Sequence, residues 1–349
     1  MAKIIGEGYS YNDVLIVPKY NKISSRTKVD FRTYVTKNYK INIPILAANM
    51  DTICESKMAI SLGKLGGLGV IHRFMDFKKE AEEVKKVKRE NLIAAAAIGV
   101  KNIEERAKAL YEAGVDIFVL DIAHGHSEYA GKTLDYLKKN FPSVDVMVGN
   151  IATKNAAKYF LRKGADALKI GIGPGSMCTT RINTGVGIPQ LTAIMDVYSV
   201  TKGKIPICAD GGIKYPGDIV KAIGAGADTV MSGFLFAGTE ETPGKIIKKN
   251  GKKYKVYRGS ASFSVSLKQI KINGENNKKI ISIEGVETIV PYKGPIAPLI
   301  KKYLGGLSSG MTYIGASKMK EIVGKADFIK ISPAGFEESK AHGLSEKNY

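Results

Sequence analysis

The sequence of 349 residues predicts an α/β fold, a TIM (β/α)8 barrel. Two observations support this prediction. Eight short apolar runs of strand length occur between residues 43 and 232, and amphipathic, helix-like stretches separate them. Strands that alternate with helices through short connections are parallel, and eight such units over roughly 200 residues match the barrel. A doubly wound sheet explains the count of eight less well, and no G-x-G-x-x-G fingerprint follows the first run.

The expected strands and helices follow in chain order. The first forty residues hold short strand and turn signals, including 10–17, and we expect them to form an N-terminal layer over the barrel floor. The clearest helices are 81–89 and 103–113, where apolar residues recur at spacings of three and four. The eight strands are expected at about 43–48, 67–71, 92–99, 116–121, 145–149, 166–170, 205–209 and 228–232.

The chain beyond the eighth strand is more polar. Residues 250–257 are typical of a hairpin arm. Residues 262–283 are rich in Lys and Asn and weakly patterned, and we interpret about 260–290 as a mobile flap. A helix-like run from Pro298 closes the barrel, and a tail at about 330–349 lies outside it. We therefore expect one catalytic domain over 1–349.

Composition excludes several classes of protein. No apolar run approaches the roughly 20 residues needed to span a bilayer, and the first residues lack the apolar core of a signal peptide. Three cysteines form neither a disulfide framework nor a zinc pattern, so we expect a cytoplasmic protein. The net charge of +20 suggests nucleic acid, but the lysines are spread out and not interleaved with aromatics. We expect no nucleic-acid partner and no membrane, although the charge favours anionic nucleotides.

Residues 171–181, GIGPGSMCTTR, are the densest functional signal in the chain. Three glycines in five residues free the backbone to curl without a Cβ penalty. Ser176 can offer a hydroxyl to a phosphate, and Cys178 presents a thiol on a loop just after a strand, which makes it a candidate nucleophile. We expect Cys54 and Cys208 to be packing residues.

Polar residues also follow the other expected strands. In a TIM barrel, catalytic groups collect at the C-terminal ends of the strands, and phosphates bind after strands seven and eight. The residues at these ends are Asn49, Met50, Asp51, His72, Arg73, 121–127, Asn150, 171–181, 210–212, Gly233 and Phe234.

The loop at 171–181 resembles the active-site loop of the inosine monophosphate dehydrogenase and guanosine monophosphate reductase family, and the similarity runs from 11–18 to 348–349. The resemblance implies that the Cys178 thiolate adds to purine C2 while hydride moves between C2 and nicotinamide. It also implies that Thr180 pairs with Glu284, either as an auxiliary base or to handle the proton that goes to ammonia.

The resemblance implies binding sites as well. The substrate phosphate would bind Ser176, Tyr257 and the amides of Gly212, Gly233 and Phe234, and Asp210 would accept from both ribose hydroxyls. Met50 would pack on the purine, whose edge would meet Gly259, Ser260 and Ala261. The cofactor, NADP(H) or NAD(H), would lie on Asp121, Ala123, His124, Ser127 and Asn150.

A potassium site is implied too. The carbonyls of Gly173, Gly175 and Cys178 resemble a monovalent cation site, to which Glu338 and Ser339 of a neighbouring subunit would contribute, so we expect a homotetramer. A metal at His124 and His126 is not supported by any pattern of Cys, Asp or Glu. Residues 88–91 run straight into the strand at Leu92, so we expect no regulatory insert of the cystathionine-β-synthase type.

The family contains two activities. The dehydrogenase uses an Arg-Tyr dipeptide in its flap to activate water, and this chain has no such dipeptide and no arginine after Arg258. Residues 121–127, 209–214 and 237–244 are closer to bacterial dehydrogenases. We weight the flap more and hypothesise a GMP reductase. IMP dehydrogenase is the alternative, and a non-catalytic nucleotide- or RNA-binding barrel is a third possibility that Cys178, Thr180 and Glu284 together argue against.

Overall fold

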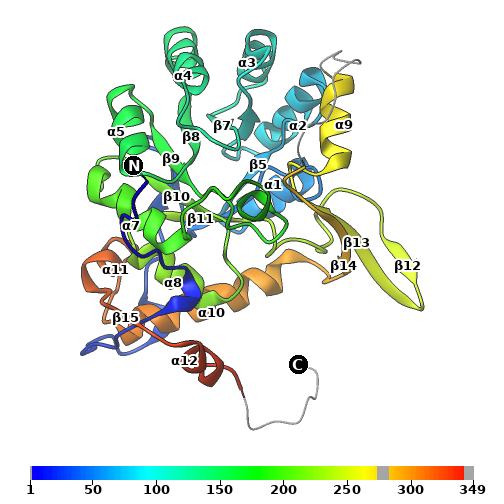
Figure 1. Cartoon of the computed structure of the whole chain (residues 1–349). Helices are drawn as coiled ribbons and strands as arrows, with labels where there is room; N and C mark the ends of the chain where they lie inside the picture. The colour runs from blue at the N-terminus through cyan, green and yellow to red at the C-terminus, as the bar shows by residue number, and fades with distance from the viewer. Residues whose placement is uncertain (1, 273–282, 342–349) are drawn as a thin grey trace.

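A closed barrel of eight parallel strands forms the centre of the computed structural model, which describes residues 2–272 and 283–341 (Figure 1). The strands follow the chain order around the barrel, and each overlaps one of the predicted apolar runs. The prediction of a TIM barrel is therefore confirmed. The strands are β4 (Ile45–Ala47), β5 (Leu68–Ile71), β6 (Ala95–Ile98), β7 (Ile117–Asp121), β8 (Asp145–Ile151), β9 (Ala167–Ile170), β10 (Ile207–Asp210) and β11 (Thr229–Ser232).

Helices alternate with the strands along the chain and surround the barrel (Figure 1). Helix α2 illustrates why they form. The Asp76 carboxylate accepts from the Lys78 amide at 2.9 Å and caps the helix, while Ala81, Val84 and Val87 on one face are buried. The surrounding helices are α1 (Ser56–Lys64), α2 (Phe77–Arg89), α3 (Ile103–Glu112), α4 (Glu128–Asn140), α5 (Lys154–Arg162), α7 (Gln190–Thr201), α8 (Pro216–Gly224) and α10 (Ile296–Tyr313).

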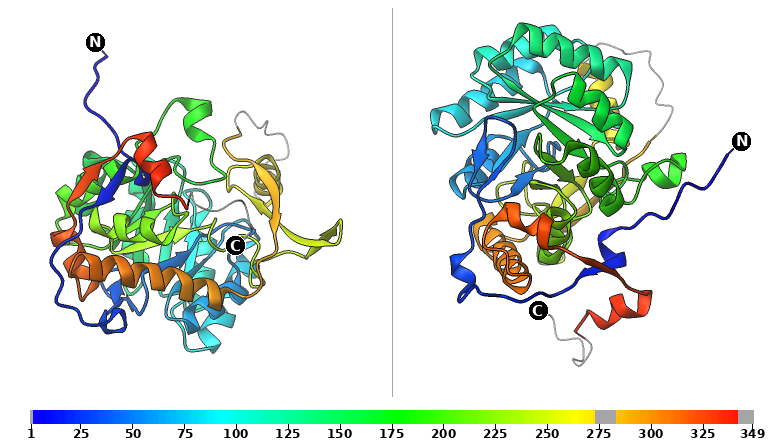
Figure 2. Two further views of the ribbon diagram at one scale, coloured as in Figure 1. Left: turned by 90° about the horizontal axis from the view of Figure 1, so that it is seen from below. Right: turned by 90° about the vertical axis from the view of Figure 1, so that its left-hand side faces the viewer.

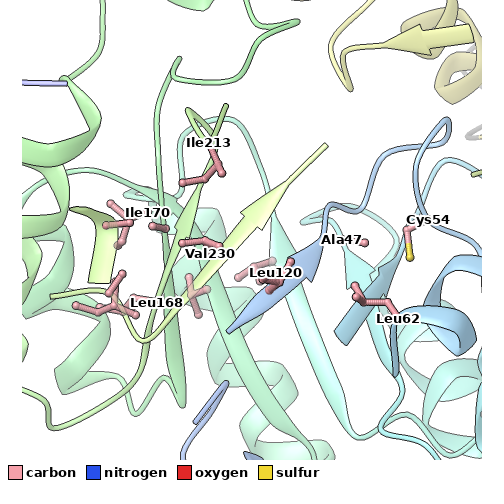
Figure 3. Close-up of a cluster of buried hydrophobic side chains, with 14 of the residues drawn as sticks. Ala47, Cys54, Leu62, Leu120, Leu168, Ile170, Ile213 and Val230 are labelled. Atoms are coloured by element: carbon pink, nitrogen blue, oxygen red, sulfur yellow. The ribbon is translucent and has the colours of Figure 1, made fainter. Parts of the chain in front are cut away.

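The strands bury side chains on both faces. Val119, Met147 and Ala167 belong to a cluster inside the barrel, whereas Leu168 and Ile170 belong to the larger cluster between the strands and the helices. Figure 3 shows part of that larger cluster. Because successive strand residues point to opposite faces, the residue between Leu168 and Ile170 points into the barrel, and that residue is Lys169.

A short hairpin closes the barrel floor. It joins β2 (Thr33–Tyr34) to β3 (Lys40–Ile41). The Thr33 hydroxyl donates to the Asp228 carbonyl at 3.0 Å, and the Asn38 amide donates to the Asp145 carboxylate at 2.7 Å. Both acceptors lie where barrel strands begin, so the predicted N-terminal layer over the floor is confirmed for residues 33–41 only.

The rest of the N-terminal segment runs along the outside of the barrel. It contains two 3-10 turns, η1 (Tyr11–Asp13) and η2 (Arg26–Lys28), and strand β1 (Val14–Ile16). Strand β1 pairs antiparallel with β15 (Phe328–Lys330), so residues 10–17 meet the C-terminal part of the chain rather than the floor. Helices α11 (Met319–Lys325) and α12 (Pro333–Glu338) belong to that part, and α12 lies outside the barrel, as predicted for the tail (Figure 2).

The segment after the eighth strand contains a projecting hairpin. Strands β12 (Ile247–Lys249) and β13 (Lys252–Arg258) form the predicted arm, which stands away from the barrel in Figures 1 and 2, and β14 (Glu287–Pro291) adds to it. Helix α9 (Phe263–Ile272) was not predicted, because Val265 is its only fully buried residue and the apolar stripe is faint. Residues 273–282 of the expected flap lie outside the described residues. Over the described residues, we find no helix of the length and apolarity needed to cross a membrane.

Candidate active site

A cavity of about 350 Å³ opens at the C-terminal ends of the barrel strands. This is the end at which the fold predicts chemistry. The cavity gathers most of the predicted site residues from segments far apart in the chain. Those that line it are Met50, Asp121, Ala123, Asn150, Gly173, Gly175, Ser176, Cys178, Thr180, Asp210, Gly212, Gly233, Phe234, Tyr257, Gly259, Ser260, Ala261 and Glu284.

The loop that carries Cys178 connects β9 to the short helix α6 (Thr180–Thr184). It leaves the strand at Gly171, whose φ is +148° and where an added Cβ would lie 2.2 Å from the Asp210 carbonyl oxygen. Arg181 holds the other end of the loop. Its guanidinium donates to the Ile172 carbonyl at 3.1 Å and to the Ile188 carbonyl at 2.6 Å. These contacts fix the loop so that Cys178 faces the cavity.

Three side chains form a relay beside the cavity. The Cys178 sulfur lies 3.1 Å from the Thr180 hydroxyl oxygen, and that hydroxyl donates to the Glu284 carboxylate at 2.7 Å. The backbone holds Glu284 there, because the Thr179 amide donates to the Glu284 carbonyl at 2.9 Å. A thiol, a hydroxyl and a carboxylate in this order can move a proton to or from a group bound next to the sulfur.

Ser176 and Tyr257 form the second part of the site. Their hydroxyl oxygens lie 3.0 Å apart. Burial raises the pKa of Tyr257 to about 12, so the hydroxyl stays protonated and can donate at neutral pH. At Gly233 an added Cβ would lie 2.6 Å from the Met50 sulfur and 3.1 Å from the Tyr257 hydroxyl, so glycine leaves the backbone beside these groups open. Hydroxyls next to a bare backbone suit a phosphate oxygen.

The third part of the site is an ionic cluster on the cavity floor, centred on Lys169. Its ammonium group donates to Asp210 at 2.5 Å, to Asp121 at 3.2 Å and to the Asn150 side-chain oxygen. Burial alone would lower the pKa of Lys169, but the two carboxylates outweigh it and raise the pKa. Burial opposes ionisation of Asp121, yet Lys169 and Arg73 hold its pKa below the usual range. The ammonium group and the Asp121 carboxylate are therefore both charged at neutral pH.

Sequence reasoning gave Lys169 no role. The sequence does contain a signal, because Lys169 interrupts the apolar run 167–170. A charged side chain in a buried strand is energetically costly unless it has partners, so its presence there indicates a polar site. The sequence also places Arg73 at the end of the second strand but does not predict a role for it. Its guanidinium lines the cavity 3.7 Å from Asp121 and stacks over the Phe74 ring. Lys214, Ser266 and Gln269 also line the cavity and were not predicted.

Four predicted site residues do not line the cavity. Ser127 caps helix α4, accepting from the Ala130 amide at 3.3 Å, and the His124 ring makes an edge contact with His126. Glu338 and Ser339 lie at the end of α12, outside the barrel. Their contribution to a neighbouring subunit stays a prediction. Within residues 2–272 and 283–341, no three His, Cys, Asp or Glu side chains form a group able to hold a metal ion.

Comparisons with known proteins place the chain in a family. Residues 8–342 match the family model described as IMP dehydrogenase / GMP reductase domain. The chain is 38% identical to the inosine-5'-monophosphate dehydrogenase of Aquifex aeolicus, covering 98% of this chain and 96% of that protein. It is 33% identical to the GMP reductase of Leishmania major, covering 97% and 98%.

A solved structure agrees with the sequence relatives. A variant of the GMP reductase from Trypanosoma brucei, in complex with guanosine 5'-monophosphate, superimposes with a TM-score of 0.92 at 30% identity, covering 98% of this chain and 99% of that one. The alignment with the Aquifex protein spans 475 positions, more than the 349 residues here, so that relative carries inserted residues. In this chain only residues 90–94 separate α2 from β6, as expected without a regulatory insert. The chain belongs to the IMP dehydrogenase / GMP reductase family of oxidoreductases.

Proposed function

We propose that this protein is a GMP reductase, which converts GMP and NADPH to IMP, ammonia and NADP. In this reaction the Cys178 thiolate adds to C2 of GMP, and the bond from C2 to the exocyclic nitrogen breaks. The exocyclic nitrogen takes up one proton and leaves as ammonia. The nicotinamide, when bound, supplies hydride to C2. The bond between C2 and sulfur then breaks, which releases IMP and regenerates the thiolate.

The observation that carries the choice of reductase is the set of arginines around the cavity. By resemblance, the dehydrogenase needs a flap guanidinium to activate water, and this sequence has no arginine after Arg258. Arg258 itself is held by the Asp51 carboxylate at 2.9 Å. Arg181 is held by two backbone carbonyls, and Arg73 faces Asp121. The Arg258 and Arg181 guanidinium groups are therefore engaged elsewhere, and Arg73, which lines the cavity, lies after the second strand rather than on the flap.

The relay suits the departure of ammonia. The Thr180 hydroxyl donates its single proton to Glu284, so its oxygen lone pairs face the sulfur and the group bound there. A proton taken up on Glu284 can pass through Thr180 to the leaving nitrogen, which cannot depart as an amide ion.

The nucleotide and cofactor have matching residues in the cavity. Ser176 and Tyr257 suit the phosphate, and Asp210 suits a ribose diol. Asp121 offers a second carboxylate for the nicotinamide ribose, and Asn150 lies between the two. We further propose that the carbonyls of Gly173, Gly175 and Cys178 hold potassium in a homotetramer to which a neighbour adds Glu338 and Ser339.

IMP dehydrogenase is the second candidate. It is favoured by the Aquifex relative and by a lysine on the segment after the barrel. Lys268 lies on α9 within the expected flap and could take the place of the flap guanidinium, although it faces Asp51 at 3.9 Å and an ammonium copies the geometry of a guanidinium poorly. The flap lysines at 278 and 279 lie outside the described residues.

Absorbance at 340 nm with two substrate pairs tests the proposal. One cuvette contains GMP and NADPH, and the other contains IMP, NAD and potassium. We expect the absorbance to fall in the first, with one ammonia released per NADPH, and to stay flat in the second. A rise in absorbance in the second cuvette, with no fall in the first, would overturn the assignment in favour of the dehydrogenase.

A further inference from the structure

We propose that Lys169 is a positioning residue. Its ammonium group holds both Asp210, which would bind the nucleotide, and Asp121, which would bind the cofactor, so that the two ligand sites depend on one lysine. The proposal rests on the proposed function for the assignment of the two carboxylates to their ligands. It does not depend on which of the two reactions the enzyme performs.

The fold builds a place for this lysine. Lys169 lies on β9, with its side chain pointing into the barrel and only 2% exposed. The neighbouring strand makes room for it, because a Cβ added at Gly149 would lie 2.6 Å from the Lys169 Cβ. A buried ammonium group without partners is very costly, so the site must supply acceptors. It does so from three strands, β7 through Asp121, β8 through Asn150 and β10 through Asp210.

The hydrogen bonds between described residues leave one carboxylate oxygen of Asp210 free. Lys169 donates to Oδ2 of Asp210, and the Asn150 amide nitrogen donates to the same oxygen at 2.9 Å. Among the contacts of the described residues, Oδ1 of Asp210 is therefore left for a ribose. Asn150 is oriented by the same lysine, since its side-chain oxygen accepts from Lys169 and its nitrogen is turned toward Asp210.

Asp121 is held by the same ammonium group and faces a second cation. Its Oδ1 accepts from Lys169, while Oδ2 faces the Arg73 guanidinium at 3.7 Å. The two carboxylates line one cavity, and the Lys169 ammonium group donates to both. Without that cation, both carboxylates lose a charge-assisted hydrogen bond that holds them in place for a diol, and the Asn150 side-chain oxygen loses its donor. The loss of one lysine should then damage both ligand sites at once.

Steady-state kinetics of Lys169→Met tests this, using whichever substrate pair the wild-type protein turns over. We expect the KM of the nucleotide and the KM of the cofactor each to rise about tenfold or more, because the aspartate that binds each ligand loses its charge-assisted hydrogen bond to Lys169. Lys169→Arg, which keeps the charge, should return both values to within about threefold of wild type. If the wild-type protein does not turn over GMP with NADPH, only the assignment as a reductase is rejected. The KM values of the Lys169 variants and the wild type can still be compared with IMP and NAD.

Two further variants separate positioning from stability. Lys138→Met removes a lysine that pairs with Asp166 at 2.7 Å near the opposite end of the barrel, and both KM values should be unchanged. Lys169→Gln lacks the charge but keeps a donor, and serves if methionine prevents folding. A purely structural role for Lys169 would lower kcat and melting temperature at constant KM, and that result would overturn the proposal. A rise in only one KM would overturn it as well.

Discussion

The three cysteines differ in ways that decide their chemistry. Cys54 and Cys208 are completely buried, and burial raises the pKa of Cys208 to about 12, so it stays a neutral thiol at neutral pH. Burial raises the pKa of Cys54 as well. Cys178 instead reaches the cavity and meets a hydroxyl. The interpretation of Cys54 and Cys208 as packing residues is confirmed.

Thr180→Val tests the relay at this scale. Valine keeps the shape of threonine but cannot connect Cys178 to Glu284, so we expect kcat to fall about a hundredfold with little change in the KM of the nucleotide. Thr179→Val is the matched control. The Thr179 hydroxyl accepts from the Asn183 amide at 3.1 Å, outside the relay, and its loss should leave kcat nearly unchanged. Equal losses in both variants would show that the relay carries no proton.

At the scale of the element, the loop after β9 depends on its first glycine. We expect Gly171→Ala to lower the free energy of unfolding by about 3 kcal/mol or more, since it adds a clash with the Asp210 carbonyl to an unfavourable backbone conformation. Gly164→Ala controls for the conformation alone, because Gly164 has φ +78° with no atom near its missing Cβ. It should cost about 1–2 kcal/mol. Urea unfolding measures both, and equal costs would contradict the role of the clash.

Helix α9 shows the limit of periodicity within one element. The run 263–272 has apolar residues, but tertiary contact buries only Val265, and the remaining side chains face outward or are half-exposed. Hydrophobic patterning detects helices through a stripe of buried residues, so a helix anchored by one residue gives almost no signal. The flap prediction therefore missed the helix.

At the scale of the whole molecule, carboxylates at the starts of the barrel strands affect stability. Asp228 accepts from the Ile207 amide at 2.8 Å, and burial raises its pKa from 3.8 to about 7. The folded state therefore binds a proton that the unfolded state releases. The stability from this proton is fully present below pH 3.8 and is lost as the pH rises through about 7.

Asp228→Asn should therefore melt at a higher temperature than wild type at about pH 8, because asparagine keeps an acceptor for Ile207 without burying a charge. The difference should be smaller at about pH 5 and should approach zero only as the pH falls to 3.8. Thermal unfolding at the two pH values measures it, with Asp135→Asn, an exposed partner of Lys163, as the control. A difference that is independent of pH would contradict the assigned titration.

The sequence by itself determined the eight strands, the position of the loop at 171–181 and its candidate nucleophile, Cys178. These are local properties, because a buried strand needs a continuous apolar run and a tight loop needs glycine, and both can be read within about ten residues. Only the tertiary structure decided which groups meet. Glu284 reaches Thr180 across 104 positions, and Lys169 gains its acceptors from three different strands. No local pattern encodes such contacts, since they depend on how the barrel closes and on where the segment after it returns.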